Sequence, residues 1–295
     1  DIGEASRAVV EMRKLQDAAG QRIVHSAEML DRKSLASVGD TTGEGLTAVL
    51  TETKAHTPEE LAANVARIGE LLGRFALYTP ARFTDDPAGQ AKYWAVRSGI
   101  FPAVGGSRPP GTTCLIEDVA FHIEDLPRAT AELQALIARH GYDDACIYGH
   151  ALEGNYHFII NQSFSEPTEV ARYEALMDDV AELVVGKYDG SLKAEHGTGR
   201  NMAPFLRREW GDDACAVMRA VKELFDPAGL LNPGVIFNDD PRCHLSHFKP
   251  LPLTDPLIDR CIECGFCEVN CLTCGLTLSS RQRIVVRREI ARLKA

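Results

Sequence analysis

GHALEGNYH, residues 149–157, is the stretch that decides the fold of this chain. The apolar run 145–148 leads into it, and the apolar run 158–160 leads out of it. Two short apolar runs separated by a loop that contains glycine are typical of adjacent β-strands. The stretch therefore predicts a β-hairpin.

The register of this hairpin follows from the length of its loop. If residues 151–154 form the loop, His150 pairs with Asn155, and His157 is the diagonal neighbour of His150 on the same face of the sheet. Two imidazoles on one face can share a metal ion. We therefore expect His150 and His157 to be metal ligands.

A third ligand is predicted in AEHGTGR, residues 194–200. Glu195 offers a carboxylate oxygen beside His196, and the glycines allow the backbone to approach a ligand closely. A His-x6-His spacing alone is a weak signal in a chain with nine histidines, and structural hydrogen bonds are the alternative role for them. Two nitrogens and one oxygen with an open position suit Zn²⁺, with Mn²⁺ and Fe²⁺ as alternatives.

The composition is that of a globular protein, with 45% hydrophobic and 25% charged residues among 295. A net charge of −10 argues against general affinity for nucleic acid or anionic membranes, with the basic segment 281–294 as an exception. The chain contains no run of about eighteen apolar residues, which argues against a transmembrane segment. Five of the nine cysteines lie within residues 261–274, a density that favours a metal cluster in a reducing compartment. We expect a cytoplasmic protein, and peripheral attachment at the inner face of the membrane stays open.

The order of strand and helix patterns predicts the fold class. Strands are expected over 46–53, 74–78, 114–121, 145–148 and 155–161, and helices over 6–19, 58–72, 125–140 and 168–187. The glycine- and proline-rich stretch 105–111 is expected to be an exposed loop. Two β-α-β units in tandem indicate an α+β fold, a ferredoxin-like antiparallel sheet with helices on one face.

The strongest spacing signal is a cysteine run of the form C-x2-C-x2-C-x3-C. Its members are Cys261, Cys264, Cys267 and Cys271. This spacing is typical of ferredoxin-type [4Fe-4S] clusters, in which three cysteines ligate one cluster and the fourth ligates another. Leu272 stands where proline normally follows the run, and Cys274 adds a fifth thiol. A tetrahedral zinc site is the alternative.

Three motifs occur in a characteristic order: the hairpin 149–157, the segment 194–200, and Phe225-Asp226-Pro227 with Leu231-Asn232-Pro233-Gly234. Together they resemble the C-terminal cap domain of FAD-linked oxidases. The resemblance is to the D-lactate and D-2-hydroxyglutarate dehydrogenase branch of the vanillyl-alcohol-oxidase-type flavoproteins, and it covers about residues 46–236.

The resemblance implies a role for individual residues. The ligands of a divalent metal beside the flavin would be His150, His157 and Glu195. His196 would be the catalytic base, and Arg97, in a Trp-x-x-Arg segment, would bind the substrate carboxylate. Asn232 would lie toward the FAD.

The resemblance also implies a division into domains. Residues 1–45 would be a connecting segment from an FAD-binding domain that is absent from this sequence, residues 46–238 the cap, and residues 239–295 the start of a ferredoxin-like [4Fe-4S] domain. Because the absent domain would bind most of the FAD, we expect the chain alone to be inactive. Ile116 stands where a lysine precedes the strand aspartate in the 2-hydroxyglutarate enzymes, which favours D-lactate as the substrate.

These observations predict part of a flavin-dependent dehydrogenase of D-2-hydroxy acids. Hydride would pass from the substrate to FAD, and electrons would pass through iron–sulfur clusters to a quinone, a cytochrome or a redox protein. A metal-dependent hydrolase with the same His/His/Glu zinc site is one alternative, although it would need no cysteine run. A non-catalytic electron-transfer subunit with structural histidines is another, and a homodimer stays open.

Overall fold

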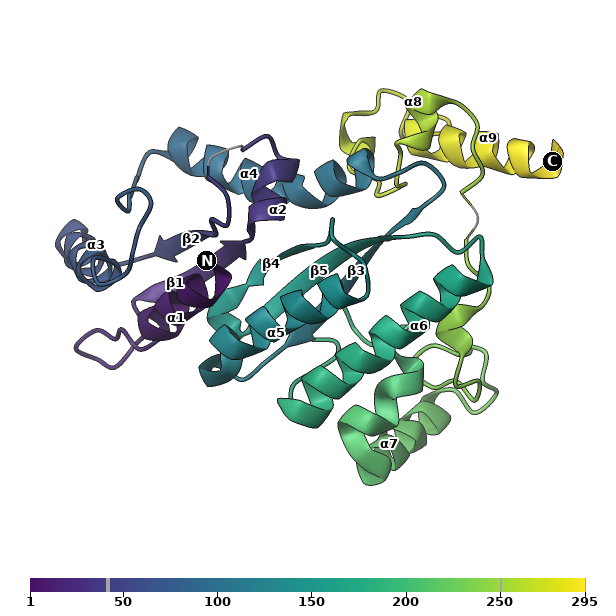
Figure 1. The fold of residues 1–295 in the computed structure, drawn as a ribbon, viewed down its shortest axis with the longest axis horizontal. Helices are drawn as coiled ribbons and strands as arrows, with labels where there is room; N and C mark the ends of the chain where they lie inside the picture. The colour runs from purple at the N-terminus through teal and green to yellow at the C-terminus, as the bar shows by residue number, and fades with distance from the viewer. Residues whose placement is uncertain (41–42, 250, 295) are drawn as a thin grey trace.

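A five-stranded antiparallel sheet forms the centre of the molecule (Figure 1). The computed structural model describes residues 1–40, 43–249 and 251–294. The strands are β1 Val24–Leu30, β2 Ala48–Thr53, β3 Thr113–Ala120, β4 Cys146–His150 and β5 Asn155–Gln162, in the spatial order β2-β1-β4-β5-β3. This arrangement confirms the predicted α+β class with an antiparallel sheet.

The helices connect and cover these strands. They are α1 Ile2–Arg13, α2 Arg32–Ser37, α3 Pro58–Leu72, α4 Pro87–Ser107, α5 Leu126–Arg139, α6 Pro167–Ala181, α7 Leu206–Phe225, α8 Pro256–Asp259 and α9 Ser280–Lys294. Helix α3 begins as predicted, because Thr57 and Glu60 form a reciprocal capping box. No helix within the described residues is long and apolar enough to cross a membrane.

The two faces of the sheet are covered differently. On β5, Tyr156, Phe158 and Ile160 point into the main core, which α1, α5 and α6 complete. Because side chains alternate along a strand, Ile159 and His157 point to the opposite face. There Ile159 packs in a smaller cluster with residues of α2 and α4. Helices therefore lie on both faces, whereas the sequence predicted only one helical layer.

Strand β1 differs most from the sequence-based division of the chain. Residues 1–45 were expected to be a connecting segment, but β1 lies between β2 and β4 in the sheet. The preceding helix, α1, is capped by Asp1 and ends at Arg13, earlier than predicted. The sequence of β1, VHSAEML, has polar residues at positions 25, 26 and 28 and no regular apolar alternation, which hides the strand in the sequence.

Two other predicted segments also differ. Residues 74–78 form local turns after α3 rather than a strand. Residues 105–107 belong to α4 rather than to a loop. A glycine is required at position 105 because a Cβ there would lie 2.5 Å from Ile262. Gly105 thus serves close packing between α4 and the cysteine-rich segment.

The hairpin that joins β4 and β5 has the predicted register. Tyr148 pairs with His157, the alignment in which His150 faces Asn155. The loop is one 3₁₀ turn, closed by Gly154 with φ +74°. A Cβ at Gly154 would lie 2.2 Å from the carbonyl oxygen of Phe121, so only glycine fits there.

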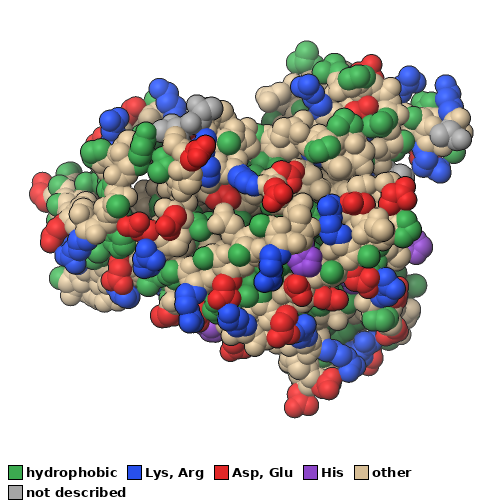
Figure 2. All heavy atoms as spheres, in the orientation of Figure 1, with side chains coloured by type: hydrophobic (Ala, Val, Ile, Leu, Met, Phe, Trp, Pro, Cys, Tyr) green, Lys and Arg blue, Asp and Glu red, His purple; other side chains and the backbone are tan. Residues whose placement is uncertain are grey.

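The surface carries charges of both signs. Figure 2 shows acidic and basic side chains interspersed over the face in view. This mixture agrees with the modest excess of acidic residues in the sequence.

Candidate metal and substrate site

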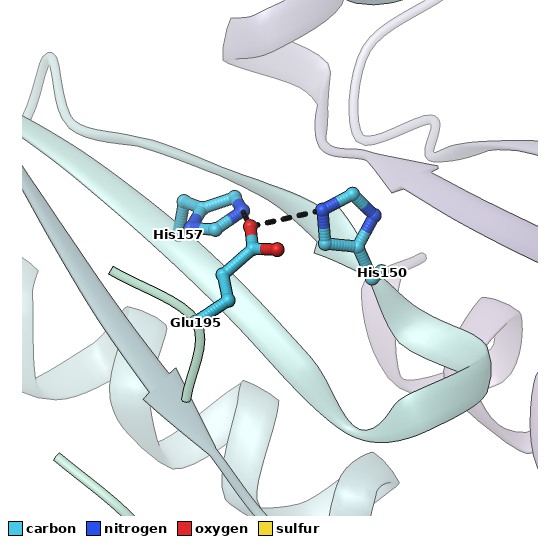
Figure 3. A group of neighbouring side chains, drawn as sticks. All are labelled: His150, His157 and Glu195. Atoms are coloured by element: carbon cyan, nitrogen blue, oxygen red, sulfur yellow. Dashed lines mark hydrogen bonds and ion pairs between the residues drawn. The ribbon is translucent and has the colours of Figure 1, made fainter. Parts of the chain in front are cut away.

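The structure brings together the three predicted metal ligands (Figure 3). His150 ends β4, His157 lies in β5, and Glu195 lies on the loop 194–200. The Glu195 Oε1 atom is 3.0 Å from the Nε2 atom of each histidine. Within the described residues, this is the only group of three or more His, Cys, Asp or Glu ligand atoms that lie within 4.8 Å of one another.

The hydrogen bonds around His150 fit a bound cation. Nδ1 of His150 is 2.7 Å from a carboxylate oxygen of Glu28, which assigns the proton of the neutral ring to Nδ1. The lone pair of Nε2 then faces Glu195 Oε1. Two ring nitrogens and a carboxylate oxygen that converge in this way attract a cation, and this donor set suits Zn²⁺.

Glu28 was not predicted from the sequence, yet it contacts two site residues. Its second oxygen accepts a hydrogen bond of 2.8 Å from Nε of Arg97. Burial raises the pKa of Glu28, but hydrogen bonds from His150 and Arg97 outweigh burial and leave the pKa lowered. The same contact with Glu28 raises the pKa of His150. His25 and Ser26 are polar as well, so nothing in the sequence of this strand singled out Glu28.

Asp118, on β3, fixes the loop that carries Glu195. Its Oδ2 atom accepts hydrogen bonds from the backbone amides of Glu195 and His196, at 2.7 and 2.9 Å. Its Oδ1 atom lies 3.4 Å from Nδ1 of His157. Burial opposes ionisation of Asp118, but its contacts with His157 and with these amides lower its pKa. One buried carboxylate therefore orients a ligand and the loop that carries another.

A second buried carboxylate holds the two ends of the same loop. Glu117 points to the opposite face of β3 and forms a 2.8 Å ion pair with Lys193. It also accepts a hydrogen bond from Asn201. The loop between these contacts is therefore tied to β3 at both ends.

His196, the predicted base, lies against the metal ligands. Its ring stacks on that of His157, with ring centroids 4.7 Å apart and planes 5° from parallel. Its Nε2 atom is 3.8 Å from Glu195 Oε1. Burial lowers the pKa of His196, so its ring is neutral near pH 7 and can accept a proton.

Arg97, the predicted carboxylate-binding residue, reaches this site from α4. Its guanidinium lies over the ring of Tyr148, 4.6 Å from the centroid. Arg97 donates to Glu28 through Nε, and no residue in the described part of the chain accepts a hydrogen bond from its two terminal nitrogens, which can therefore bind a ligand. Glu28 thus links Arg97 to the metal ligand His150.

Asn232 lies in an exposed turn beside the site loop. The backbone amide of Ile236, at the end of this turn, donates a 2.9 Å hydrogen bond to the carbonyl of Gly199. The turn containing Asn232 is therefore attached to the loop that carries Glu195 and His196.

The cysteine run lies at the far end of α4 (Figure 1). Cys264 and Cys267 are exposed, and Cys261 and Cys271 are partly buried. The buried guanidinium of Arg108 donates hydrogen bonds to the backbone carbonyls of residues 259, 260 and 261. Arg288, on α9, also donates to the carbonyl of Cys261, at 2.7 Å. Two arginines therefore attach the first cysteine to the rest of the molecule.

Comparison with known proteins gives consistent similarities. The family model of FAD linked oxidases, C-terminal domain, matches residues 1–236. Glycolate oxidase subunit GlcD of Escherichia coli K12 is 31% identical over 211 residues, 70% of this chain and 41% of that protein. D-2-hydroxyglutarate dehydrogenase of Xanthomonas citri pv. viticola is 34% identical over 152 residues, 50% of this chain and 30% of that protein. D-lactate dehydrogenase of Anaerostipes hadrus is 28% identical over 152 residues, 52% of this chain and 31% of that protein.

The chain spans less than half the length of each of these relatives. The family match begins at residue 1 and includes β1, in agreement with the position of this strand inside the sheet.

Proposed function

Because this chain belongs to the family of FAD-linked oxidase C-terminal domains, we propose that it is the substrate-binding cap of a flavin-dependent dehydrogenase of small 2-hydroxy acids. The observation that carries the proposal is the convergence of His150, His157 and Glu195 beside His196 and Arg97. The three relatives are named for glycolate, D-lactate and D-2-hydroxyglutarate, and each of these molecules contains a 2-hydroxycarboxylate. This shared group is the substrate class that we assign.

Each residue of the site has a separate role in the proposed reaction. His150, His157 and Glu195 would hold a divalent metal that would lower the pKa of the substrate hydroxyl, and bound FAD would supply the hydride acceptor. The free guanidinium nitrogens of Arg97 bind the substrate carboxylate as a bidentate pair. Nε2 of the neutral His196 accepts the hydroxyl proton. Asn232, whose turn is attached to the site loop, would lie toward the flavin.

D-lactate is the substrate that we favour. Ile116 lies on the same face of β3 as Asp118, because side chains alternate along a strand. An apolar side chain at this position offers no positive charge to a second carboxylate, so Ile116 favours a substrate with one carboxylate. We therefore place D-lactate ahead of D-2-hydroxyglutarate.

Binding of D-lactate to the 295-residue chain tests this function. We expect Zn²⁺ to tighten binding at least about tenfold in calorimetric titrations, because the metal and Arg97 hold the hydroxyl and the carboxylate together. Propionate, which lacks only the hydroxyl, is the matched control and should show little zinc dependence. Equal binding of D-lactate with and without zinc would contradict the proposal.

We further propose that residues 239–295 begin a ferredoxin-like [4Fe-4S] domain, with residues 46–238 and strand β1 forming the cap. Arg97 and Arg108 are both on or next to α4, about 16 Å apart at 1.5 Å per residue. Arg108 in turn holds the backbone of Cys261. This arrangement supports electron transfer from the flavin to a cluster and on to a quinone, a cytochrome or a redox protein, in a cytoplasmic enzyme.

Chemical analysis of the cysteine run tests the cluster. After anaerobic reconstitution with iron and sulfide, we expect the chain to retain iron and acid-labile sulfide in about equal amounts. Cys264→Ser should lose both, whereas Cys114→Ser, outside the run, should retain them. Zinc without sulfide would instead indicate a tetrahedral zinc site.

A further inference from the structure

We propose that Glu28 is a positioning residue that couples the metal ligand His150 to the substrate-binding Arg97. The inference rests on the proposed function and adds a residue that the hairpin and the site loop do not contain. Glu28 lies in β1, directly opposite His150 of β4, as the strand pairing shows. Arg97 comes from α4, so three separate elements meet at this carboxylate.

Each oxygen of Glu28 has its own partner. Oε1 is 2.7 Å from Nδ1 of His150, and Oε2 is 2.8 Å from Nε of Arg97. The carboxylate is 5% exposed and the Arg97 side chain 14% exposed, so water competes little for these bonds. Glu28 therefore keeps His150 and Arg97 at a constant separation, and both residues must act on the same substrate.

The bond to His150 selects the tautomer that can bind a metal. A proton held on Nδ1 leaves the lone pair of Nε2 directed at the position shared with Glu195 and His157. Carboxylates behind metal-binding histidines typically contribute about 10–100-fold to metal affinity. We therefore expect Glu28 to strengthen zinc binding without touching the ion.

The bond to Arg97 leaves both terminal nitrogens of the guanidinium available. With Nε held by Glu28 and the planar group resting on Tyr148, the fork of NH₂ groups has one preferred direction. Glu28 thus orients the carboxylate-binding group as well as the metal ligand.

The Glu28→Gln variant tests the contacts with His150 and Arg97, because glutamine has nearly the same size as glutamate and so leaves the packing of the side chain almost unchanged. An amide replaces one carboxylate oxygen by an NH2 group, which only donates, so it cannot accept a hydrogen bond at both of the positions that contact His150 and Arg97. We expect the zinc Kd of the chain to rise about 10–100-fold by calorimetric titration. The ¹⁵N signal of the protonated Nδ1 of His150 should change as well.

Asp31→Asn is the matched control. Asp31 follows β1, is 2% exposed, and also uses both oxygens, accepting from the amides of Ser34 and Ile147. This variant loses the same acceptor but does not contact the metal site, so its zinc Kd should stay within about twofold of wild type. If Glu28→Gln fails to fold, Glu28→Asp keeps both oxygens but is one methylene shorter, and it should bind zinc about tenfold more weakly.

A double-mutant cycle tests the Arg97 half of the proposal. At saturating zinc, Glu28→Gln should raise the D-lactate Kd about tenfold in the wild-type background and less than twofold in the Arg97→Met background. Equal penalties in both backgrounds would show that Glu28 does not act through Arg97.

The outcomes distinguish this inference from the function on which it rests. A folded Glu28→Gln chain with wild-type zinc affinity would overturn the positioning role and leave the metal site intact. A wild-type chain that binds no divalent metal would overturn both.

Discussion

Glu195→Gln is expected to weaken Zn²⁺ binding by about 100-fold or more. Outer residues that only orient a ligand already contribute about 10–100-fold, and Glu195 is the only carboxylate of the triad. A neutral amide oxygen would replace a charged one. In the holoenzyme assembled with FAD, the rate of 2-hydroxy acid oxidation should fall about 1000-fold, because a metal ion contributes several kcal/mol to charge stabilisation.

The fold should tolerate this change. The Glu195 side chain is 47% exposed, and its backbone amide, rather than its side chain, bonds to Asp118. Glu153→Gln is a matched control, because Glu153 lies in the loop of the hairpin that carries His150 and His157, has a side chain 53% exposed, and pairs with Arg13 and Arg22. Its zinc affinity should equal that of wild type. Unchanged zinc binding by Glu195→Gln would remove the carboxylate from the metal site.

His196→Gln is expected to lower kcat by about 10²–10⁴-fold and to leave zinc affinity nearly unchanged. General bases contribute about this much to the rate, and His196 stacks on a metal ligand without belonging to the triad. Calorimetry on the chain and steady-state kinetics on the holoenzyme measure the two effects separately. His122→Gln, with a side chain 62% exposed, is the control and should retain full activity.

The pH dependence of the rate tests the same role. Burial lowers the pKa of His196 below its ordinary value of 6.5. A general base acts in its deprotonated form, so kcat/KM of the wild-type holoenzyme should be constant near pH 7 and fall as the pH drops through this lowered pKa. The acidic limb should disappear in His196→Gln. An unchanged limb would identify another group as the base.

The sequence by itself determined the features that depend on neighbouring residues. The apolar runs 145–148 and 158–160 and the short loop between them specify the hairpin, so the register that places His150 and His157 on one face was predicted correctly. The capping box at Thr57 specifies the start of α3 in the same way. Glu195 was predicted as the third ligand from its glycine-flanked segment and from the family resemblance, and the fold brings it beside these histidines.

Only the tertiary structure decided which buried carboxylates support the site. Glu28 meets Arg97, 69 positions away, and His150, 122 positions away, so no local pattern could assign its partners. The place of β1 in the sheet likewise depends on pairing with β4, more than 100 residues later. The close packing of Gly105 in α4 against Ile262 also joins segments more than 150 residues apart. Periodicity and turn chemistry act over a few residues, whereas burial of a charge is decided by distant segments that supply its hydrogen-bond partners.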